Sequence, residues 1–124
     1  MTKIKNISKL NKWFDGISEP LIIAGPCSAE SEEQVLTTAK EIAALGKVHV
    51  FRSGIWKPRT RPGNFEGIGE EGLQWLQLAK QETGLLTAVE VANKEHFDLA
   101  VKYDIDILWI GARTTSNPFS VQDL

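Results

Sequence analysis

Acidic residues are missing from one stretch of this 124-residue chain. Between Ile42 and Phe65 there is no Asp or Glu, whereas five Lys or Arg and one His fall within the same 24 residues. The chain as a whole has a formal net charge of −2, so positive charge is concentrated locally. This pattern argues against general nucleic-acid binding, which calls for a broad basic face. It favours a site for a small, multiply charged anion such as a sugar phosphate.

Cysteine and long apolar runs are also scarce. Cys27 is the sole cysteine and cannot form an internal disulfide, which indicates a reducing, cytoplasmic setting. No apolar run approaches the roughly 20 residues that cross a bilayer, and the first 20 residues contain no apolar signal-peptide core. We therefore expect no membrane association. The hydrophobic content of 42% and charged content of 24% are typical of one globular domain.

The few arginines all fall where strands are expected to end. They are Arg52, Arg59, Arg61 and Arg113, whereas the lysines are scattered. A guanidinium group can clamp a phosphate with two parallel hydrogen bonds. Any one of these side chains could equally be a solvated loop charge, but the set of four favours anion binding.

Apolar runs alternate with helical spacings along the chain. The expected strands are Leu21–Gly25, Val48–Arg52, Leu85–Val89 and Ile105–Ile110, and the expected helices run from a Ser28 or Ser31 cap to Gly46, over Glu70–Thr83 and over Lys94–Tyr103. Such alternation predicts an α/β fold with a parallel sheet covered by helices. Residues 1–19 form an expected arm with a short helix, residues 20–124 the domain, and Ser53–Gly69 and Gly111–Leu124 are expected loops.

Parallel strands all end at one edge of their sheet, which is where ligands bind in α/β proteins. Cys27, Arg52, Glu90 and Arg113 end or follow the four expected strands. They should therefore converge there with the basic loop.

Two of these residues allow more than one interpretation. Cys27 could be a small buried side chain, a nucleophile or a ligand of a divalent metal. Glu90 could orient Arg or Lys side chains or handle a proton. His49 should face away from Arg52 because side chains alternate along a strand, and His96 falls on an expected helix. Neither histidine is a good metal partner for Cys27.

Four motifs give the chain a family resemblance. They read GPCSAE at 25–30, FR at 51–52, KPRT at 57–60 and IGAR at 110–113, followed by NP at 117–118. In this order and spacing, the chain from about residue 20 to its end resembles the 3-deoxy-D-arabino-heptulosonate 7-phosphate (DAHP) synthase family. It is most similar to the short branch related to 3-deoxy-manno-octulosonate 8-phosphate synthases. The octulosonate enzymes typically carry a Lys-Ala-Asn-Arg-Ser version of the third motif, so KPRT favours the heptulosonate enzyme.

The resemblance implies a (β/α)8 barrel that condenses phosphoenolpyruvate with erythrose 4-phosphate in the first step of the shikimate pathway. It implies that Cys27 is one ligand of a divalent metal. It also implies that Arg52 and Arg113 hold phosphoenolpyruvate.

The remaining roles that the resemblance implies lie mostly in the basic loop. Lys57 would reach between the two substrates, close to the reacting carbons. Arg59 and Thr60 would anchor erythrose 4-phosphate. Glu90 matches a carboxylate at the rim of the family's barrel, and Arg61 has no counterpart there.

The chain departs from the family in length, because a (β/α)8 barrel needs about 250 residues and only four strands are expected here. We therefore expect the amino-terminal half of the barrel, about four βα units, inactive by itself because the other metal ligands come from later strands. The full-length protein is expected to be a homo-oligomer, and a carboxyl-terminal chorismate mutase or regulatory extension is possible. The alternatives are an octulosonate phosphate synthase, a non-catalytic phosphate-binding half-barrel and a flavodoxin-like anion-binding domain.

Overall fold

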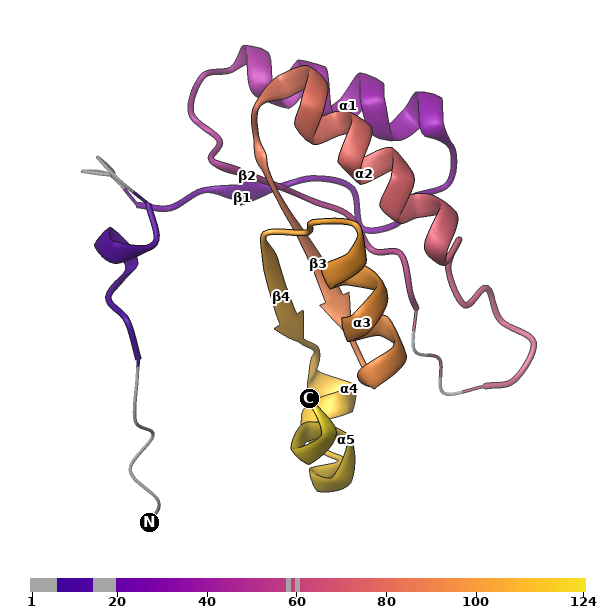
Figure 1. Ribbon diagram of the computed structural model, residues 1–124. Coiled ribbons are helices and arrows are strands. Elements are labelled where there is room, and N and C mark those ends of the chain that lie inside the picture. The colour runs from indigo at the N-terminus through magenta and orange to yellow at the C-terminus, as the bar shows by residue number, and fades with distance from the viewer. Residues whose placement is uncertain (1–6, 15–19, 58, 60) are drawn as a thin grey trace.

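The computed structural model is an α/β structure in which the described residues are 7–14, 20–57, 59 and 61–124. Four parallel strands form one sheet in the order β1-β2-β3-β4 (Figure 1). The strands are β1 (Ile23–Ala24), β2 (Val50–Arg52), β3 (Leu86–Val91) and β4 (Ile107–Ile110). The helices are η1 (Leu10–Lys12), α1 (Glu32–Ala44), α2 (Glu70–Thr83), α3 (Lys94–Lys102), α4 (Ala112–Thr115) and α5 (Pro118–Asp123).

Local sequence signals explain where the helices begin and end. The Ser31 hydroxyl accepts a hydrogen bond from the Gln34 N–H and caps α1, and the Asn93 side chain caps α3 in the same way. These caps satisfy backbone donors that have no partner within the helix. Helix α2 ends at Gly84, which adopts the left-handed conformation with φ 73° that glycine tolerates best.

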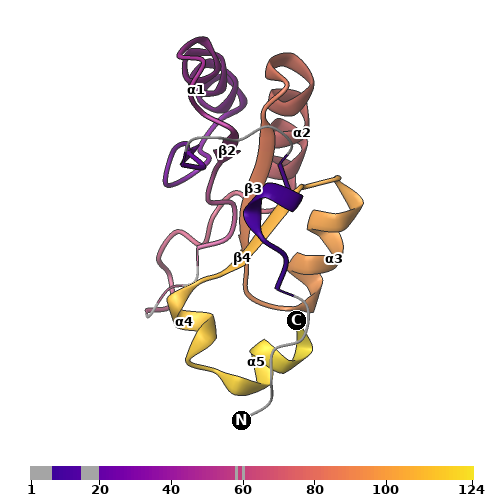
Figure 2. The same ribbon diagram turned by 90° about the vertical axis from the view of Figure 1, so that its left-hand side faces the viewer.

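The helices cover one face of the sheet. Phe51, Val89 and Val91 point from the strands into a core built with residues of α1, α2 and α3. The other face carries a smaller cluster in which Val50 and Ala88 contact Phe14 of the amino-terminal arm. In Figure 2 this arm crosses in front of the sheet, and α4 and α5 lie together at the end of the molecule away from α1 and α2. Phe14, at the end of the described part of the arm, packs on the open sheet face.

Strand order and helix placement confirm the predicted fold class. Each strand pairs with its sequence neighbours, and α1, α2 and α3 contribute to the same core on one face of the sheet. A doubly wound sheet would reverse its strand order and place helices on both faces. The chain therefore forms four successive βα units of a (β/α)8 arrangement, in which the face without helices is the barrel interior.

Strand register sets which side chains share the interior face. Arg52 pairs with Ala88, and Glu90 pairs with Trp109. Because side chains alternate along a strand, Arg52, Glu90 and Trp109 all project from the open face. Ala88 is small and almost fully buried. Its size lets the Arg52 guanidinium reach across β3 to lie 6.0 Å from the ring centre of Trp109.

All four expected strands differ from the structure in their bounds, most clearly the first, and one expected loop contains helices. The first strand was predicted over Leu21–Gly25 but spans only Ile23–Ala24, because β1 has a single neighbour, β2, to define its ladder. The segment Gly111–Leu124 was predicted as a loop but contains α4 and α5. Among the described residues, no helix is both long and apolar enough to cross a membrane.

Candidate anion-binding site at the carboxyl ends of the strands

Residues that end or follow each of the four strands meet at the carboxyl edge of the sheet. A hollow of about 240 Å³ is lined by Cys27, Ser28, Lys57, Arg59, Glu90 and Arg113. Five of the seven predicted site residues therefore line one cavity. Arg52 lies beside it, and Thr60 falls outside the described residues.

Cys27 and Lys57 form the closest pair in this hollow. The Lys57 ammonium group donates a hydrogen bond to the Cys27 carbonyl oxygen, and its Nζ lies 3.4 Å from the Cys27 Sγ. The hydrogen bond from Lys57 and its positive charge lower the pKa of the Cys27 thiol, with a smaller contribution from Arg52. The thiol is exposed, so it is not the buried hydrophobe that was one of its interpretations. A thiolate at this position is suited to nucleophilic chemistry or to binding a metal.

Two glycines let the backbone segments of the site approach closely. A side chain at Gly54 would collide with the Cys27 carbonyl and the Lys57 ammonium group. Gly25 adopts φ +151°, and a Cβ there would collide with the Arg52 carbonyl. The loops after β1 and β2 can therefore meet only because both positions lack a side chain.

Arg52 is held beside the hollow rather than inside it. Its Nη1 donates to the Pro26 carbonyl oxygen at 3.3 Å, and its guanidinium lies over Trp109. Both contacts come from other strands or the loops that follow them, so they fix the direction of the guanidinium. The two contacts leave further N–H groups of the guanidinium for a ligand, since Arg carries five.

Glu90 occupies space that Gly111 leaves open. A Cβ at Gly111 would collide with the Glu90 carboxylate, so the glycine after β4 allows this side chain to lie at the rim. Glu90 shares the hollow with Lys57, Arg59 and Arg113. This arrangement is compatible with an orienting role for the carboxylate, which remains a prediction.

The basic loop between β2 and α2 has internal backbone contacts, although it was predicted to have no regular structure. The Lys57 N–H donates to the Glu66 carbonyl at 2.7 Å, and the Gly69 N–H donates to the Ile55 carbonyl at 3.1 Å. Arg59 Nε donates to the Phe65 carbonyl at 2.7 Å. The loop therefore folds back on itself and presents Lys57 and Arg59 from a held backbone.

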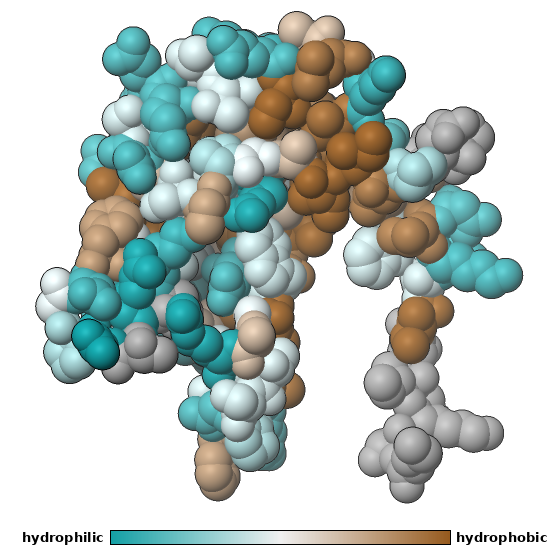
Figure 3. Space-filling view, turned by 180° about the vertical axis from the view of Figure 1, so that it is seen from behind, coloured by the Kyte–Doolittle hydropathy of each residue, from teal (hydrophilic) through white to brown (hydrophobic). Residues whose placement is uncertain are grey.

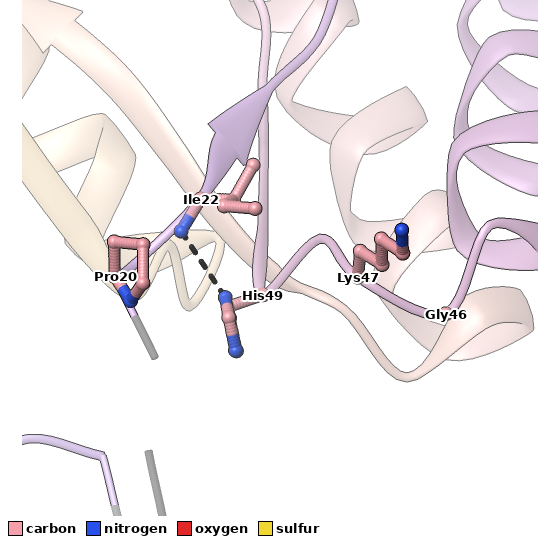
Figure 4. A pocket seen from close by; sticks show the side chains of 5 residues that line it. All are labelled: Pro20, Ile22, Gly46, Lys47 and His49. Atoms are coloured by element: carbon pink, nitrogen blue, oxygen red, sulfur yellow. Dashed lines mark hydrogen bonds between the residues drawn. The ribbon is translucent and has the colours of Figure 1, made fainter. Parts of the chain in front are cut away.

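Neither histidine joins Cys27. His49 lies at the opposite edge of the sheet, where its Nδ1 accepts a hydrogen bond from the Ile22 N–H at 3.1 Å beside a second hollow of about 430 Å³ (Figure 4). His96 stacks on Trp56. Within the described residues, no group of three or more His, Cys, Asp or Glu side chains could hold a metal ion. Cys27 is thus suited to be one ligand of a metal, and by itself it is not a site.

Three contributors to the site were missed from the sequence. Ser28 lines the hollow, and its position directly after Cys27 was the available signal. Gly54 has no sequence signal beyond its place in the loop. The Trp56–His96 contact joins residues 40 positions apart and follows no periodic pattern.

The strand order places this chain in the class of α/β-barrel proteins, with a candidate anion site at the carboxyl ends of its strands. The chain belongs to the DAHP synthetase I family, whose model matches residues 3–123. The chain is 42% identical to the phospho-2-dehydro-3-deoxyheptonate aldolase of Thermotoga maritima over 96 residues, which are 77% of this chain and 28% of that protein. It is also 42% identical over 93 residues to the 2-dehydro-3-deoxyphosphooctonate aldolase of Hydrogenovibrio crunogenus, covering 68% of this chain and 34% of that one.

Solved structures agree with this assignment. The crystal structure of the Thermotoga maritima phospho-2-dehydro-3-deoxyheptonate aldolase (DAHP synthase) matches with a TM-score of 0.70 and 41% identity, over 78% of this chain and 28% of that one. A truncated form of the 3-deoxy-D-arabino-heptulosonate 7-phosphate synthase from the same organism matches with a TM-score of 0.64 and 38% identity, over 78% and 33% of the two chains. The chain spans about a third of the length of these relatives.

Proposed function

We propose that this chain forms part of the active site of a DAHP synthase, which joins phosphoenolpyruvate to erythrose 4-phosphate. The observation that carries the proposal is the convergence of Cys27, Lys57, Arg59, Glu90 and Arg113 on one hollow. These residues follow or end four different strands. Both substrates are phosphorylated anions, and the guanidinium and ammonium groups at this rim are suited to hold them.

The proposed reaction forms a carbon–carbon bond between two bound molecules. C3 of phosphoenolpyruvate attacks the aldehyde carbon of erythrose 4-phosphate, water adds at C2, and inorganic phosphate leaves as the C2 carbonyl forms. Holding both reactants in a fixed orientation removes several kcal/mol, on the order of 7–11 at best, from such a barrier. We assign Arg52 and Arg113 to phosphoenolpyruvate and Arg59 and Thr60 to the sugar phosphate.

Lys57 and Cys27 have different proposed roles. The Lys57 ammonium group, which contacts both the carbonyl and the thiol of Cys27, would place a positive charge close to the reacting carbons. Cys27 would provide one ligand to a divalent metal ion, which would polarise the aldehyde oxygen of the acceptor when bound. The further ligands would have to come from outside the described residues, since no group of three is present within them.

The choice of acceptor depends on the KPRT segment. The heptulosonate and octulosonate relatives have equal identity to this chain, at 42%, over 77% and 68% of it. Identity therefore does not separate the two substrates. The Lys57–Thr60 segment favours erythrose 4-phosphate by its resemblance to the heptulosonate enzymes. We further propose that the protein works in a reducing, cytoplasmic setting that keeps the Cys27 thiol free, as a homo-oligomer.

A substrate comparison tests the proposal. The full-length synthase to which this chain is proposed to belong is assayed for phosphate release from phosphoenolpyruvate, with erythrose 4-phosphate or arabinose 5-phosphate as acceptor. We expect turnover with the first sugar, and Lys57→Met should reduce it by about a hundredfold or more if the ammonium group acts on the reacting atoms. Preferential turnover of arabinose 5-phosphate would establish the octulosonate reaction instead. Binding of phosphoenolpyruvate without turnover of either sugar would leave a phosphate-binding role.

A further inference from the structure

The basic loop is fastened to α3 by two stacked rings. The Trp56 and His96 ring centres lie 4.0 Å apart and their planes are inclined by 7°. Both residues are half-buried. Trp56 directly precedes Lys57, and His96 is in the first turn of α3, which follows the strand that carries Glu90. The stack thus joins two of the segments that form the anion site.

His96 is fixed from its own side of the contact. Its Nδ1 accepts a hydrogen bond from the Ala92 N–H at 3.2 Å, and its backbone N–H donates to the Asn93 Oδ1 at 2.8 Å. An accepting Nδ1 places the ring proton of the neutral imidazole on Nε2. Burial lowers the pKa of His96, and the charge of Glu95 opposes this effect. The ring is therefore a neutral, oriented plane against which an aromatic side chain can pack.

The residues on either side of Trp56 are held by backbone hydrogen bonds. The carbonyl of the preceding residue, Ile55, accepts from Gly69, and the N–H of the following residue, Lys57, donates to Glu66. A hollow of about 360 Å³ beside the stack is lined by Lys57 and Arg59 as well as by the two rings. Lys57 and Arg59 also line the anion site. Because Trp56, Lys57 and Arg59 belong to one loop, we expect a change in the position of Trp56 to move both cations.

We propose that His96 is a positioning residue: by stacking on Trp56 it fixes the basic loop to the start of α3 and so sets where Lys57 and Arg59 stand at the anion site. The fastening itself follows from the geometry of the rings. Its consequence for substrate binding rests on the proposed function.

Trypsin reports on the fastening without any reference to activity. Lys57 and Arg61 both precede proline, and trypsin does not cut such bonds. The Arg59–Thr60 bond is consequently the only tryptic bond from Lys57 to Phe65. Its cleavage rate in the native protein, followed by mass spectrometry of the fragments, measures how often this part of the loop is released from its position.

We expect His96→Ala to speed cleavage at Arg59–Thr60 by about two- to tenfold, as loss of an aromatic pair would do. Trp56→Leu should do the same, Trp56→Phe should stay near the parent rate because it keeps a ring, and the double variant His96→Ala/Trp56→Leu should add little to either single change. His49→Ala is the matched control, because it removes the other histidine and its hydrogen bond to Ile22 at the opposite edge of the sheet. An unchanged rate in His96→Ala, or an equal increase in His49→Ala, would overturn the proposal.

A binding measurement with inorganic phosphate distinguishes the structural role of the Trp56–His96 contact from its role at the anion site. Calorimetric titration should show that His96→Ala binds phosphate more weakly than the parent, by a factor similar to the change in cleavage rate. Trp56→Phe, which keeps a ring, should bind phosphate as tightly as the parent. Faster cleavage with unchanged phosphate binding would keep the fastening and remove its role at the anion site. A parent protein that binds no phosphate while the cleavage pattern holds would count against the proposed function alone.

Discussion

At the scale of single residues, the contact between Cys27 and Lys57 is the most consequential feature of the site. The two residues are 30 positions apart in the sequence, yet Nζ of one lies 3.4 Å from Sγ of the other. The pair exists because Gly54 leaves room for both groups. A motif identifies each residue, but only the fold shows that the charge of one acts on the thiol of the other.

This contact predicts unusual thiol reactivity. The hydrogen bond and charge of Lys57 lower the pKa of Cys27, and only the thiolate is alkylated efficiently. In a chelator-containing buffer, the rate of iodoacetamide alkylation should therefore reach half its maximum at a lower pH than for an ordinary cysteine. Lys57→Met should move that midpoint upward and slow alkylation severalfold at neutral pH.

Lys47→Met provides the control for this titration. Lys47 lines the hollow at the other edge of the sheet, so its loss changes the net charge of the protein equally without touching Cys27. Equal shifts in the two variants would mean that overall charge, rather than the Lys57 contact, sets the thiol pKa.

At the scale of elements, an ionic and hydrogen-bonded cluster joins α2 to the sheet. Lys80 of α2 contacts Asp106 Oδ1 at 2.9 Å, and Asp106 Oδ2 accepts from the backbone N–H and the hydroxyl of Thr87 at 2.9 and 3.2 Å. One carboxylate thus ties α2, β3 and the start of β4 together. Asp106 and Lys80 are 23% and 26% exposed at their side chains, so the cluster is only partly screened by water.

Replacing this carboxylate should destabilise the protein measurably. In Asp106→Ala the Thr87 N–H and the Lys80 ammonium group both lose a partner, and we expect a loss of about 1–3 kcal/mol in the free energy of unfolding. The matched control is Asp98→Ala, which removes an exposed pair with Lys94 one helical turn away and should cost about 0.5 kcal/mol or less. Urea denaturation of both variants provides the comparison, and equal losses would refute the role of the cluster.

The difference in unfolding free energy between the parent and Asp106→Ala should depend on pH, and the pKa of Lys80 gives its direction. The hydrogen bond to Asp106, followed by that to Asp104, raises the pKa of Lys80. A group whose pKa is raised on folding stabilises the fold fully below its unfolded pKa, about 10.4 for lysine, and loses that contribution as the pH rises through the folded value. The gap between the parent and Asp106→Ala should therefore narrow at strongly alkaline pH.

Elements with clear boundary signals were predicted well from the sequence. Helix α2 spans Glu70–Thr83 as predicted, because Gly69 and Gly84 border it. Helix α5 was missed although its signal was present: Asn117 caps it and Pro118 occupies its first turn. Asn117 and Pro118 were interpreted only as part of the family motif and not as the start of a helix. Contacts between segments far apart in the sequence, such as that of Trp56 in the basic loop with His96 of α3, depend on how the strands align, and no local pattern encodes that alignment.

At the scale of the whole molecule, the sheet face without helices is the main structural liability. Ile23, which pairs with Val50 and shares the open face with it, is exposed, and Figure 3 shows hydrophobic residues gathered beside the amino-terminal arm. The sheet has β1 and β4 as its edge strands. Open strand edges and apolar patches favour association between chains.

We therefore predict that the 124-residue polypeptide, expressed alone, self-associates at micromolar concentration. Sedimentation velocity should show species larger than 13.8 kDa. Ile23→Lys should reduce association, since it places a charge on both the edge strand and the open face. Leu45→Lys, a change on the far end of α1, tests whether any lysine on an exposed apolar residue has the same effect. A monomeric parent polypeptide would contradict the prediction.

The final prediction concerns catalysis by these 124 residues alone. In the proposed reaction they would supply cations for both phosphates and one thiol, but the described part of the chain contains no group of three metal-binding side chains. Orientation of the substrates without a fixed metal leaves the developing charge on the aldehyde oxygen largely uncompensated. We expect calorimetry to detect phosphoenolpyruvate binding that Arg113→Ala weakens, while no phosphate is released in the presence of erythrose 4-phosphate and divalent metal. Metal-dependent turnover that disappears in Cys27→Ser would refute this expectation, because it would show that the 124-residue polypeptide assembles a working metal site without further protein residues.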